Sequence, residues 1–184
     1  MIQIREITPD DAGKLLQLMH ELDHEAEYLL YEPGERPIDV DAMREHIRKL
    51  EPPRFGTFFV AETVRAVHPD KPSTRPETDM NTEFAGYLEV RRLPWKRVQH
   101  RAFLVIGILK RYGGKGVGTR LMQEVESWAR KHGMRRLYLT LIAENEAAAA
   151  LYRKMGYETE GRHPASMRLG DRYAEELTMG KWLD

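Results

Sequence analysis

A glycine-rich, positively charged stretch is the first feature of this sequence that points to chemistry. It runs from Arg111 to Gly118, reads RYGGKGVG, and holds four glycines and two cations. Glycine loses more conformational freedom on folding than any other residue, so such a stretch lowers stability unless something offsets it. An apolar run precedes it and a helical pattern follows, and the first N–H groups of a helix have no partner within the helix. The stretch therefore predicts a site where an anionic ligand lies close to the backbone.

Two familiar phosphate-binding motifs do not fit these glycines. The triphosphate loop needs a glycine where the chain has Leu109, and a serine or threonine where it has Gly116. The dinucleotide pattern GxGxxG needs a glycine at Thr119 or at Leu121. A nucleotide-binding protein of another fold is therefore disfavoured, and competition between ATP and coenzyme A would distinguish it.

The motif that remains is Arg111-x-x-Gly114-x-Gly116-x-Gly118. It resembles the pyrophosphate-binding signature (Arg/Gln)-x-x-Gly-x-(Gly/Ala) of the GCN5-related N-acetyltransferase (GNAT) family. The segment 145–157, NEAAAALYRKMGY, is similar to the family's next motif, an asparagine followed by a helix that carries Leu-Tyr and then Gly-Phe or Gly-Tyr. The end of the chain, GDRYAEELTMGKW, also looks like the family's terminal strand segment. The resemblance is clear over about half of the chain.

The resemblance implies transfer of an acetyl group from acetyl-coenzyme A (acetyl-CoA) to an amine, by direct attack in a ternary complex. Backbone N–H groups of 114–119 would bind the pyrophosphate, and the preceding strand would bind the pantetheine arm. The implied cofactor-binding residues are Ile108, Leu109, Lys110, Arg111, Gly113, Gly114, Lys115, Gly116, Val117, Gly118, Thr119, Asn145 and Tyr152. For Arg111 and Lys115, the alternative is a solvated surface charge.

Asn145 and Tyr152 lie seven residues apart. This is nearly two helical turns, so both lie on about the same face of a helix. The resemblance implies that Asn145 binds the coenzyme arm and that Tyr152 is the general acid to the leaving thiolate, whose pKa in solution is about 8.5 by analogy with cysteine. Asparagine is also a good N-cap and tyrosine a common core residue, so both alternatives stay open.

The resemblance does not supply a general base. Some family members have a glutamate near the start of the strand before the glycines, where this chain has Ala102. Histidine is a residue type that can exchange a proton near neutral pH, which makes His100 a candidate, and Glu89 lies on the neighbouring predicted strand, so either is a candidate that acts through water. Taken alone, each is better explained as an ordinary surface or structural group, and an amine that arrives unprotonated needs no strong base.

The acceptor amine is expected between the two N-terminal helices and the late strands. The segment 20–35, HELDHEAEYLLYEPGE, carries six carboxylates that would attract a cationic amine. A solvated helix face is at least as good an explanation. Small amines, amino-acid derivatives, aminoglycoside-like compounds and protein N-termini all stay open as acceptors, and homodimers are common among proteins of this kind.

Composition limits the other classes of function. Lys plus Arg and Asp plus Glu are equal at 29 each, so no nucleic-acid partner is predicted, although a local basic patch stays open. With no cysteine, thiolate metal sites and disulfides are ruled out, and no metal site is predicted. The longest apolar run, 103–109 including Gly107, is far shorter than a membrane span, and the N-terminus is too charged for a signal peptide. We therefore expect a soluble, cytoplasmic protein without a membrane partner.

Hydrophobic periodicity predicts the elements that position these residues. Strands are predicted at 2–7, 54–64, 83–92, 101–110, 136–142, 157–163 and 173–182, and helices after Thr8, at 39–50, from about 117 and from about 145. The strand at 101–110 is predicted to be buried on both faces. The polar segment 68–82, with three prolines, predicts an exposed loop.

These elements fit a single α/β domain over residues 1–184, with an acetyl-CoA-binding core at about 101–157. With the resemblance, they predict a mixed, mostly antiparallel sheet of six or seven strands, flanked by about four helices. Two central strands should splay apart to admit the pantetheine arm. A non-catalytic module that senses acetyl-CoA is the alternative function; it could do without Tyr152, so the presence of Tyr152 favours the enzyme.

Overall fold

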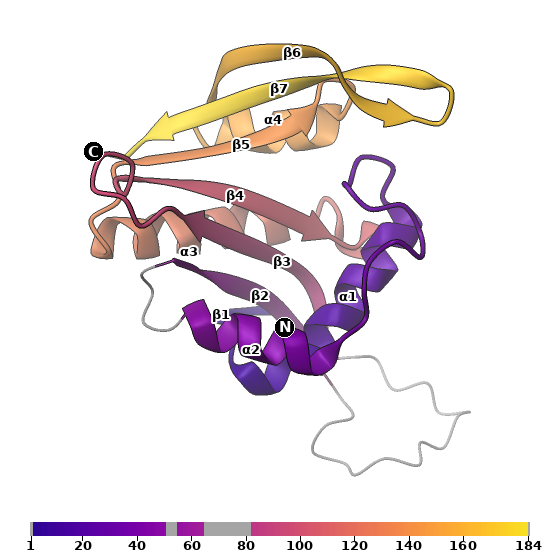
Figure 1. Cartoon of the computed structure of the whole chain (residues 1–184), viewed down its shortest axis with the longest axis vertical. Helices are drawn as coiled ribbons and strands as arrows, with labels where there is room; N and C mark the ends of the chain where they lie inside the picture. The colour runs from indigo at the N-terminus through magenta and orange to yellow at the C-terminus, as the bar shows by residue number, and fades with distance from the viewer. Residues whose placement is uncertain (1, 51–54, 65–81, 184) are drawn as a thin grey trace.

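The computed structural model describes residues 2–50, 55–64 and 82–183 (Figure 1). The described residues form one seven-stranded sheet in the order β1-β2-β3-β4-β5-β7-β6. Neighbouring strands are antiparallel except for β4 and β5, which are parallel. The strands are β1 (Ile2–Glu6), β2 (Gly56–Val64), β3 (Thr82–Arg92), β4 (Arg101–Ile108), β5 (Arg136–Ile142), β6 (Glu158–Leu169) and β7 (Arg172–Trp182). The mixed, mostly antiparallel α/β fold class is therefore confirmed.

Four α-helices accompany the sheet in the described part of the chain: α1 (Ala12–Glu25), α2 (Val40–Leu50), α3 (Val117–Lys131) and α4 (Glu146–Lys154). Two short 3-10 turns, η1 (Pro9–Asp11) and η2 (Lys110–Tyr112), precede α1 and α3. Thr8 begins η1 with a capping box to Asp11, as its position before Pro9 predicts. The loop expected at 68–82 falls outside the described residues, apart from Thr82, which begins β3.

Different helices cover the two faces of the sheet. On one face, α1 and α2 bury Leu15, Leu22 and Ile47 against Phe58 of β2. On the other face, α3 and α4 pack on a larger cluster that draws on β2, β3, β4, β5 and β7. The helical stripe of α3 lies in that cluster and consists of Val117, Leu121, Val125 and Trp128.

β4 differs from its prediction, because neither of its faces is buried along its whole length. Ala102 and Leu104 are buried under α3, whereas Phe103 and Val105, on the opposite face, are only partly buried. α1 approaches β4 closely at Gly107, where a Cβ atom would lie 2.7 Å from Leu22 Cδ1. The expectation of burial on both faces is wrong because the core under α1 and α2 is built mainly on β2 and β3 and leaves part of β4 accessible.

Candidate active site

The candidate site begins where β4 and β5 separate. The pairing between these parallel strands covers Arg101–Phe103 and Arg136–Tyr138 and stops there. β4 continues to Ile108 and β5 to Ile142, and Figure 1 shows the two strands diverging over that distance. The expected splay of two central strands is therefore present.

The backbone of β4 faces this gap at alternate residues. Leu109 N donates to Ala85 O of β3 at 3.0 Å. In an antiparallel pair, alternate residues bond to the same neighbour, so residues 105, 107 and 109 face β3. Ile106 and Ile108 then turn their N–H and C=O groups towards the gap. An unpaired strand edge of this kind can bind an extended amide chain.

The backbone of β5 lines the other side of the gap. Ala143 N donates to Glu175 O at 2.9 Å, so the odd-numbered residues of β5 bond to β7. Thr140 and Ile142 consequently face β4. The sequence alone does not single out these two residues, because their direction depends on the register with β7.

The glycine stretch forms the turn between β4 and α3. Gly114 and Gly116 have φ angles of +68° and +79°, which L side chains rarely adopt, and a Cβ atom at either would meet nothing within 4 Å. Gly116 is the N-cap of α3, and the bond from Arg120 N to its carbonyl is 3.1 Å long. The amides of 117–119 precede that bond and have no acceptor within the helix. The turn therefore has the open backbone that an anion site requires.

Two other members of the stretch have a packing role. A Cβ atom at Gly118 would lie 2.7 Å from Leu151 Cδ2 and 3.0 Å from Ile108 Cδ1, so glycine here lets α3 approach α4 and β4. Val117 is buried in the core, and only its backbone can serve a ligand. The Leu109 side chain is also fully buried, and its amide is bonded to β3.

The two cations of the stretch have different surroundings. The Arg111 guanidinium donates to the carboxylates of Glu21 and Glu83, and the bond to Glu21 raises the pKa of Arg111. Lys110 N donates to the Glu25 carboxylate, so α1 is tied to this turn twice. Lys115 is exposed, with its Nζ 5.5 Å from the centre of the Tyr112 ring. The charge of Arg111 is thus neutralised by carboxylates of this chain.

Asn145 and Tyr152 stand at the start and in the last turns of α4. Asn145 Oδ1 accepts from Ala148 N at 3.2 Å, so the capping role is present and the amide nitrogen is left for other partners. Tyr152 is 4% exposed and packs in the cluster that includes Leu139 of β5 and borders Ile106 of β4. Burial raises the pKa of the Tyr152 phenol, so the hydroxyl stays protonated.

The two candidate bases lie at different distances from the gap. Glu89 is buried on β3 and pairs with Val105 of β4, beside the separated stretch. Both of its oxygens accept from Arg91 at 2.7 Å. His100 precedes β4 and stacks on Trp182, with ring centroids 6.3 Å apart. Five residues of extended strand, roughly 16 Å, separate His100 from Val105, so the structure brings Glu89 near the gap and not His100.

A hollow of about 440 Å³ lies between the end of α1 and the turn that joins β6 to β7. Charged side chains from both sides line it: Asp23, Glu25, Glu27, Glu32, Arg168 and Arg172. Asp23 accepts from Arg36 at 2.8 Å, and Glu27 pairs with Arg172 at 3.7 Å. The hollow lies where the acceptor was expected, between the N-terminal helices and the late strands.

Comparison with known proteins identifies the family. The model of the acetyltransferase (GNAT) family matches residues 24–157, which is more than half of the chain. The chain belongs to the GNAT family. Spermidine N(1)-acetyltransferase of Escherichia coli K12 is 25% identical over 183 residues, which cover 97% of this chain and 84% of that protein. Two uncharacterized N-acetyltransferases of Bacillus subtilis match over about 60 residues, and the match spans only 24% and 38% of their lengths.

Solved structures of GNAT proteins have the same fold. An acetyltransferase of the GNAT family from Streptococcus pneumoniae superposes with a TM-score of 0.84 at 25% identity, and each chain is covered completely. A putative acetyltransferase from Salmonella typhimurium, solved with acetyl-CoA, gives a TM-score of 0.76 at 15% identity, over 100% of this chain and 94% of that one. The fold expected from the glycine and asparagine motifs is thus shared with known GNAT structures.

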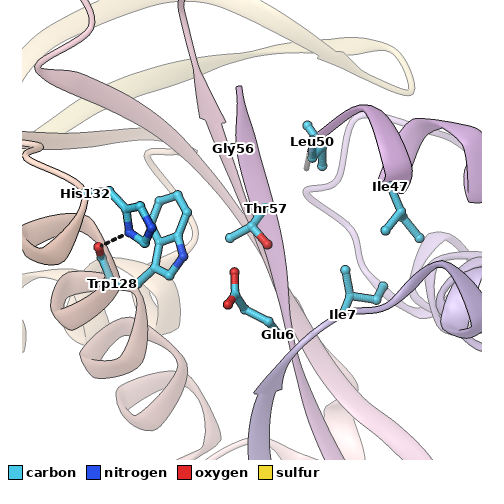
Figure 2. A pocket seen from close by; sticks show the side chains of 8 residues that line it. All are labelled: Glu6, Ile7, Ile47, Leu50, Gly56, Thr57, Trp128 and His132. Atoms are coloured by element: carbon cyan, nitrogen blue, oxygen red, sulfur yellow. Dashed lines mark hydrogen bonds between the residues drawn. The ribbon is translucent and has the colours of Figure 1, made fainter. Parts of the chain in front are cut away.

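A second, smaller hollow of this GNAT chain lies away from the site. It measures about 190 Å³ and includes Gly56 at the start of β2. Figure 2 shows Trp128 and His132 on the same side of β2 as Glu6 and Thr57. His132 Nδ1 lies 2.7 Å from Trp128 O, and the two rings lie 4.2 Å apart. None of the predicted site residues lines this hollow.

Two features are absent from the described residues. Over 2–50, 55–64 and 82–183, no group of three or more His, Cys, Asp or Glu is placed to hold a metal ion. Within the same ranges, no helix is both long and apolar enough to cross a membrane.

Proposed function

We propose that the protein is an N-acetyltransferase that moves an acetyl group from acetyl-CoA to a primary amine within a ternary complex. One observation carries this proposal: the unpaired backbone of Ile106 and Ile108 leads directly into the open amides at the start of α3. The first suits the amide-containing pantetheine arm, and the second suits a pyrophosphate. The acetyl-CoA complex of the Salmonella relative supports the same ligand.

Tyr152 is assigned to the leaving group. The amine nitrogen attacks the thioester carbonyl carbon, the carbon–sulfur bond breaks, and the sulfur leaves with the electron pair. The buried, protonated phenol donates a hydrogen bond to that sulfur and acts as its general acid. Because burial raises the pKa of Tyr152, its proton stays on the phenol oxygen and is available to the sulfur as the carbon–sulfur bond breaks. N–H groups on the open edge of β4 are assigned to the oxyanion of the tetrahedral intermediate.

Glu89 is the proposed base and acts through water. It lies beside the separated stretch of β4, and each of its oxygens can still accept a second hydrogen bond besides those from Arg91. The proton that the amine loses passes to this carboxylate. His100, held against Trp182 at the paired end of β4, is the weaker candidate.

The acceptor enters the hollow between α1 and the β6–β7 turn. The carboxylates that line it favour a cationic amine, in keeping with the similarity to a spermidine acetyltransferase. Arg168 on the opposite wall suits the carboxylate of an amino-acid-like acceptor or the carbonyl groups of a peptide that offers its N-terminus. A small amine is the first class to screen.

Calorimetric titration with acetyl-CoA tests the proposal, with ATP and NADH as controls. We expect one-to-one binding of acetyl-CoA alone, followed by thiol release with a cationic amine. Absence of acetyl-CoA binding in folded protein would refute the assignment. Binding without turnover of any amine would instead favour a sensor.

Replacing Tyr152 by phenylalanine tests the catalytic step. We expect kcat to fall about 100-fold, within the usual range for a general acid, with unchanged affinity for acetyl-CoA. Tyr157→Phe is the matched control, because Tyr157 is equally buried, 6.2 Å away between ring centres, and has no assigned role. Full turnover by Tyr152→Phe would remove the acid role.

A further inference from the structure

A strongly basic surface lies at the end of the sheet opposite the glycine turn. Two segments form it: 91–101, RRLPWKRVQHR, and 130–136, RKHGMRR. The first contributes five Arg or Lys and the second four, with one His in each and no Asp or Glu in either. The chain as a whole is balanced at 29 of each sign, so this is a marked local excess. We call these two segments the basic surface.

Backbone contacts join the two segments. Arg135 N and Arg136 N both donate to His100 O, at 2.7 and 3.1 Å. Arg101 and Arg136 are directly paired in the sheet. Leu183 N donates to Arg135 O at 2.8 Å, which adds the end of β7 to the same surface. Figure 1 shows the loop between β3 and β4 beside the C-terminus.

Several charges on the basic surface have no counterion. Arg91 pairs with Glu89 and Arg136 with Glu160. Arg130 lies 3.8 Å from Glu126. In contrast, the described residues supply no ion pair to six of the cations: Arg92, Lys96, Arg97, Arg101, Lys131 and Arg135. The Nε atom of Arg101 is also buried without a hydrogen-bond partner among them. Uncompensated like charges repel, so this arrangement suits a ligand that carries several negative charges.

Flat rings are interleaved with these cations. Trp95 and Trp182 are 66% and 60% exposed, which is unusual for large apolar side chains. His100 stacks on Trp182 at an interplanar angle of 13°. Tyr138 lies between Arg101 and Arg136, whose guanidinium carbons are 5.4 and 5.0 Å from its ring centre. Exposed rings among free cations are the arrangement that binds single-stranded nucleic acid, with phosphates on the cations and bases on the rings.

We propose that the basic surface binds a single-stranded polynucleotide, with its phosphates on the cations that have no ion pair and its bases on Trp95 and Trp182. An acidic protein segment would satisfy the charges, but it gives no reason for two exposed indoles. The length of β4, roughly 25 Å, separates this surface from the glycine turn. The polynucleotide and acetyl-CoA can therefore be bound at the same time. This proposal revises the sequence-based expectation of no nucleic-acid partner, which rested on the net charge of the whole chain.

Fluorescence anisotropy of a labelled oligouridine of about 20 nucleotides, titrated with the full chain, measures the binding. We expect affinity to fall about 100-fold between about 50 and 200 mM salt, as for about five phosphate contacts on a single strand. Lys96→Glu with Arg97→Glu should weaken binding more than about tenfold. The control is Arg153→Glu with Lys154→Glu, which makes the same charge change on exposed residues at the end of α4. It should change the oligouridine affinity by no more than about twofold.

The tryptophans distinguish a polynucleotide from other polyanions. Trp95→Ala and Trp182→Ala should each weaken oligouridine binding about tenfold, as expected for loss of one base-stacking contact. Equal binding of polyglutamate with no effect of either substitution would replace the proposal with an acidic protein partner. Preferential binding to phosphatidylserine vesicles, or no oligouridine binding at low salt, would also overturn it. Thermal melting and acetyl-CoA titration of the same variants show that each is folded and keep this test separate from the proposed enzyme activity.

Discussion

The two ends of β4 offer positive charge in different ways. Beyond Ile108, the positive potential comes from backbone amides at the start of α3, and Arg111 is neutralised by Glu21 and Glu83. Before Arg101, it comes from long side chains without counterions among the described residues. Helix amides are fixed in position, whereas lysine and arginine side chains adapt to their ligand. The first arrangement selects a ligand of one shape, and the second suits a flexible polyanion.

Salt concentration should separate the two ends most strongly. Between about 50 and 200 mM salt, oligouridine affinity should fall about 100-fold, because free side chains exchange counterions with the phosphates. Acetyl-CoA affinity should fall less than about fivefold, because amide dipoles carry no condensed ions to exchange. Parallel titrations of both ligands measure the ratio. Equal salt dependence would show that both sites rest on side-chain charge.

The glycines at the two ends of α3 test whether fixed amides matter. Gly116 and Gly133 have φ angles of +79° and +71°, and neither is crowded. Valine at either position should cost roughly 1–3 kcal/mol of stability, because it rarely adopts such angles. Gly116→Val should also lower acetyl-CoA affinity about 30-fold by re-aiming the amides, a loss of about 2 kcal/mol.

Gly133→Val is the matched control for that loss. It carries the same local strain at the other end of the helix, so acetyl-CoA affinity should stay within about twofold while the melting temperature falls. Calorimetry and thermal melting of both variants separate the two effects. If both substitutions weaken acetyl-CoA binding equally, general destabilisation of α3 is the cause.

The two buried phenols extend the comparison to α4. The Tyr157 hydroxyl is buried without a hydrogen-bond partner among the described residues. Tyr157→Phe should therefore raise the free energy of unfolding by about 1 kcal/mol and leave kcat unchanged. Urea unfolding and the thiol-release assay measure the two quantities. A loss of turnover would mean that the hydroxyl finds a partner once the substrates bind.

The smallest effect is expected at Arg111. Its guanidinium is engaged by Glu21 and Glu83, so Arg111→Gln should change acetyl-CoA affinity less than about threefold. Since Arg111 is exposed, the change in stability should be no more than about 1 kcal/mol. Calorimetry again provides the measurement. A loss of tenfold or more would mean that Arg111 leaves the carboxylates to bind the pyrophosphate.

The sequence was sufficient where structure depends on neighbours along the chain. The stripe of α3, the turn at Gly114 and Gly116, and the Asn145 cap follow from local spacing, and all three are present. The fold class followed from the family resemblance, because the order of elements does not by itself fix the pairing of strands. A hollow lies between α1 and the β6–β7 turn, where the acceptor was expected, and its assignment to the acceptor stays a proposal.

The sequence was insufficient where distant segments meet. The sequence left open whether Arg111 contacts a ligand or is a surface charge, and the carboxylates that it contacts lie 90 and 28 residues away in the chain. Leu109 looked like part of the coenzyme edge, but strand alternation turns its amide to Ala85. The prediction that β4 is buried on both faces was wrong for the same reason, since the extent of α1 and α2 over the sheet is a property of the tertiary packing.

The short pairing between β4 and β5 also has a mechanical consequence. The sheet consists of two sections, β1–β4 and β5–β7–β6, joined edge to edge by only three residue pairs. β1 belongs to one section and β7 to the other, so a pulling force applied through these two strands loads that narrow seam first. A ligand bound along both open edges would contact both sections and hold them together. The force needed to rupture a single molecule should therefore report whether the coenzyme is bound.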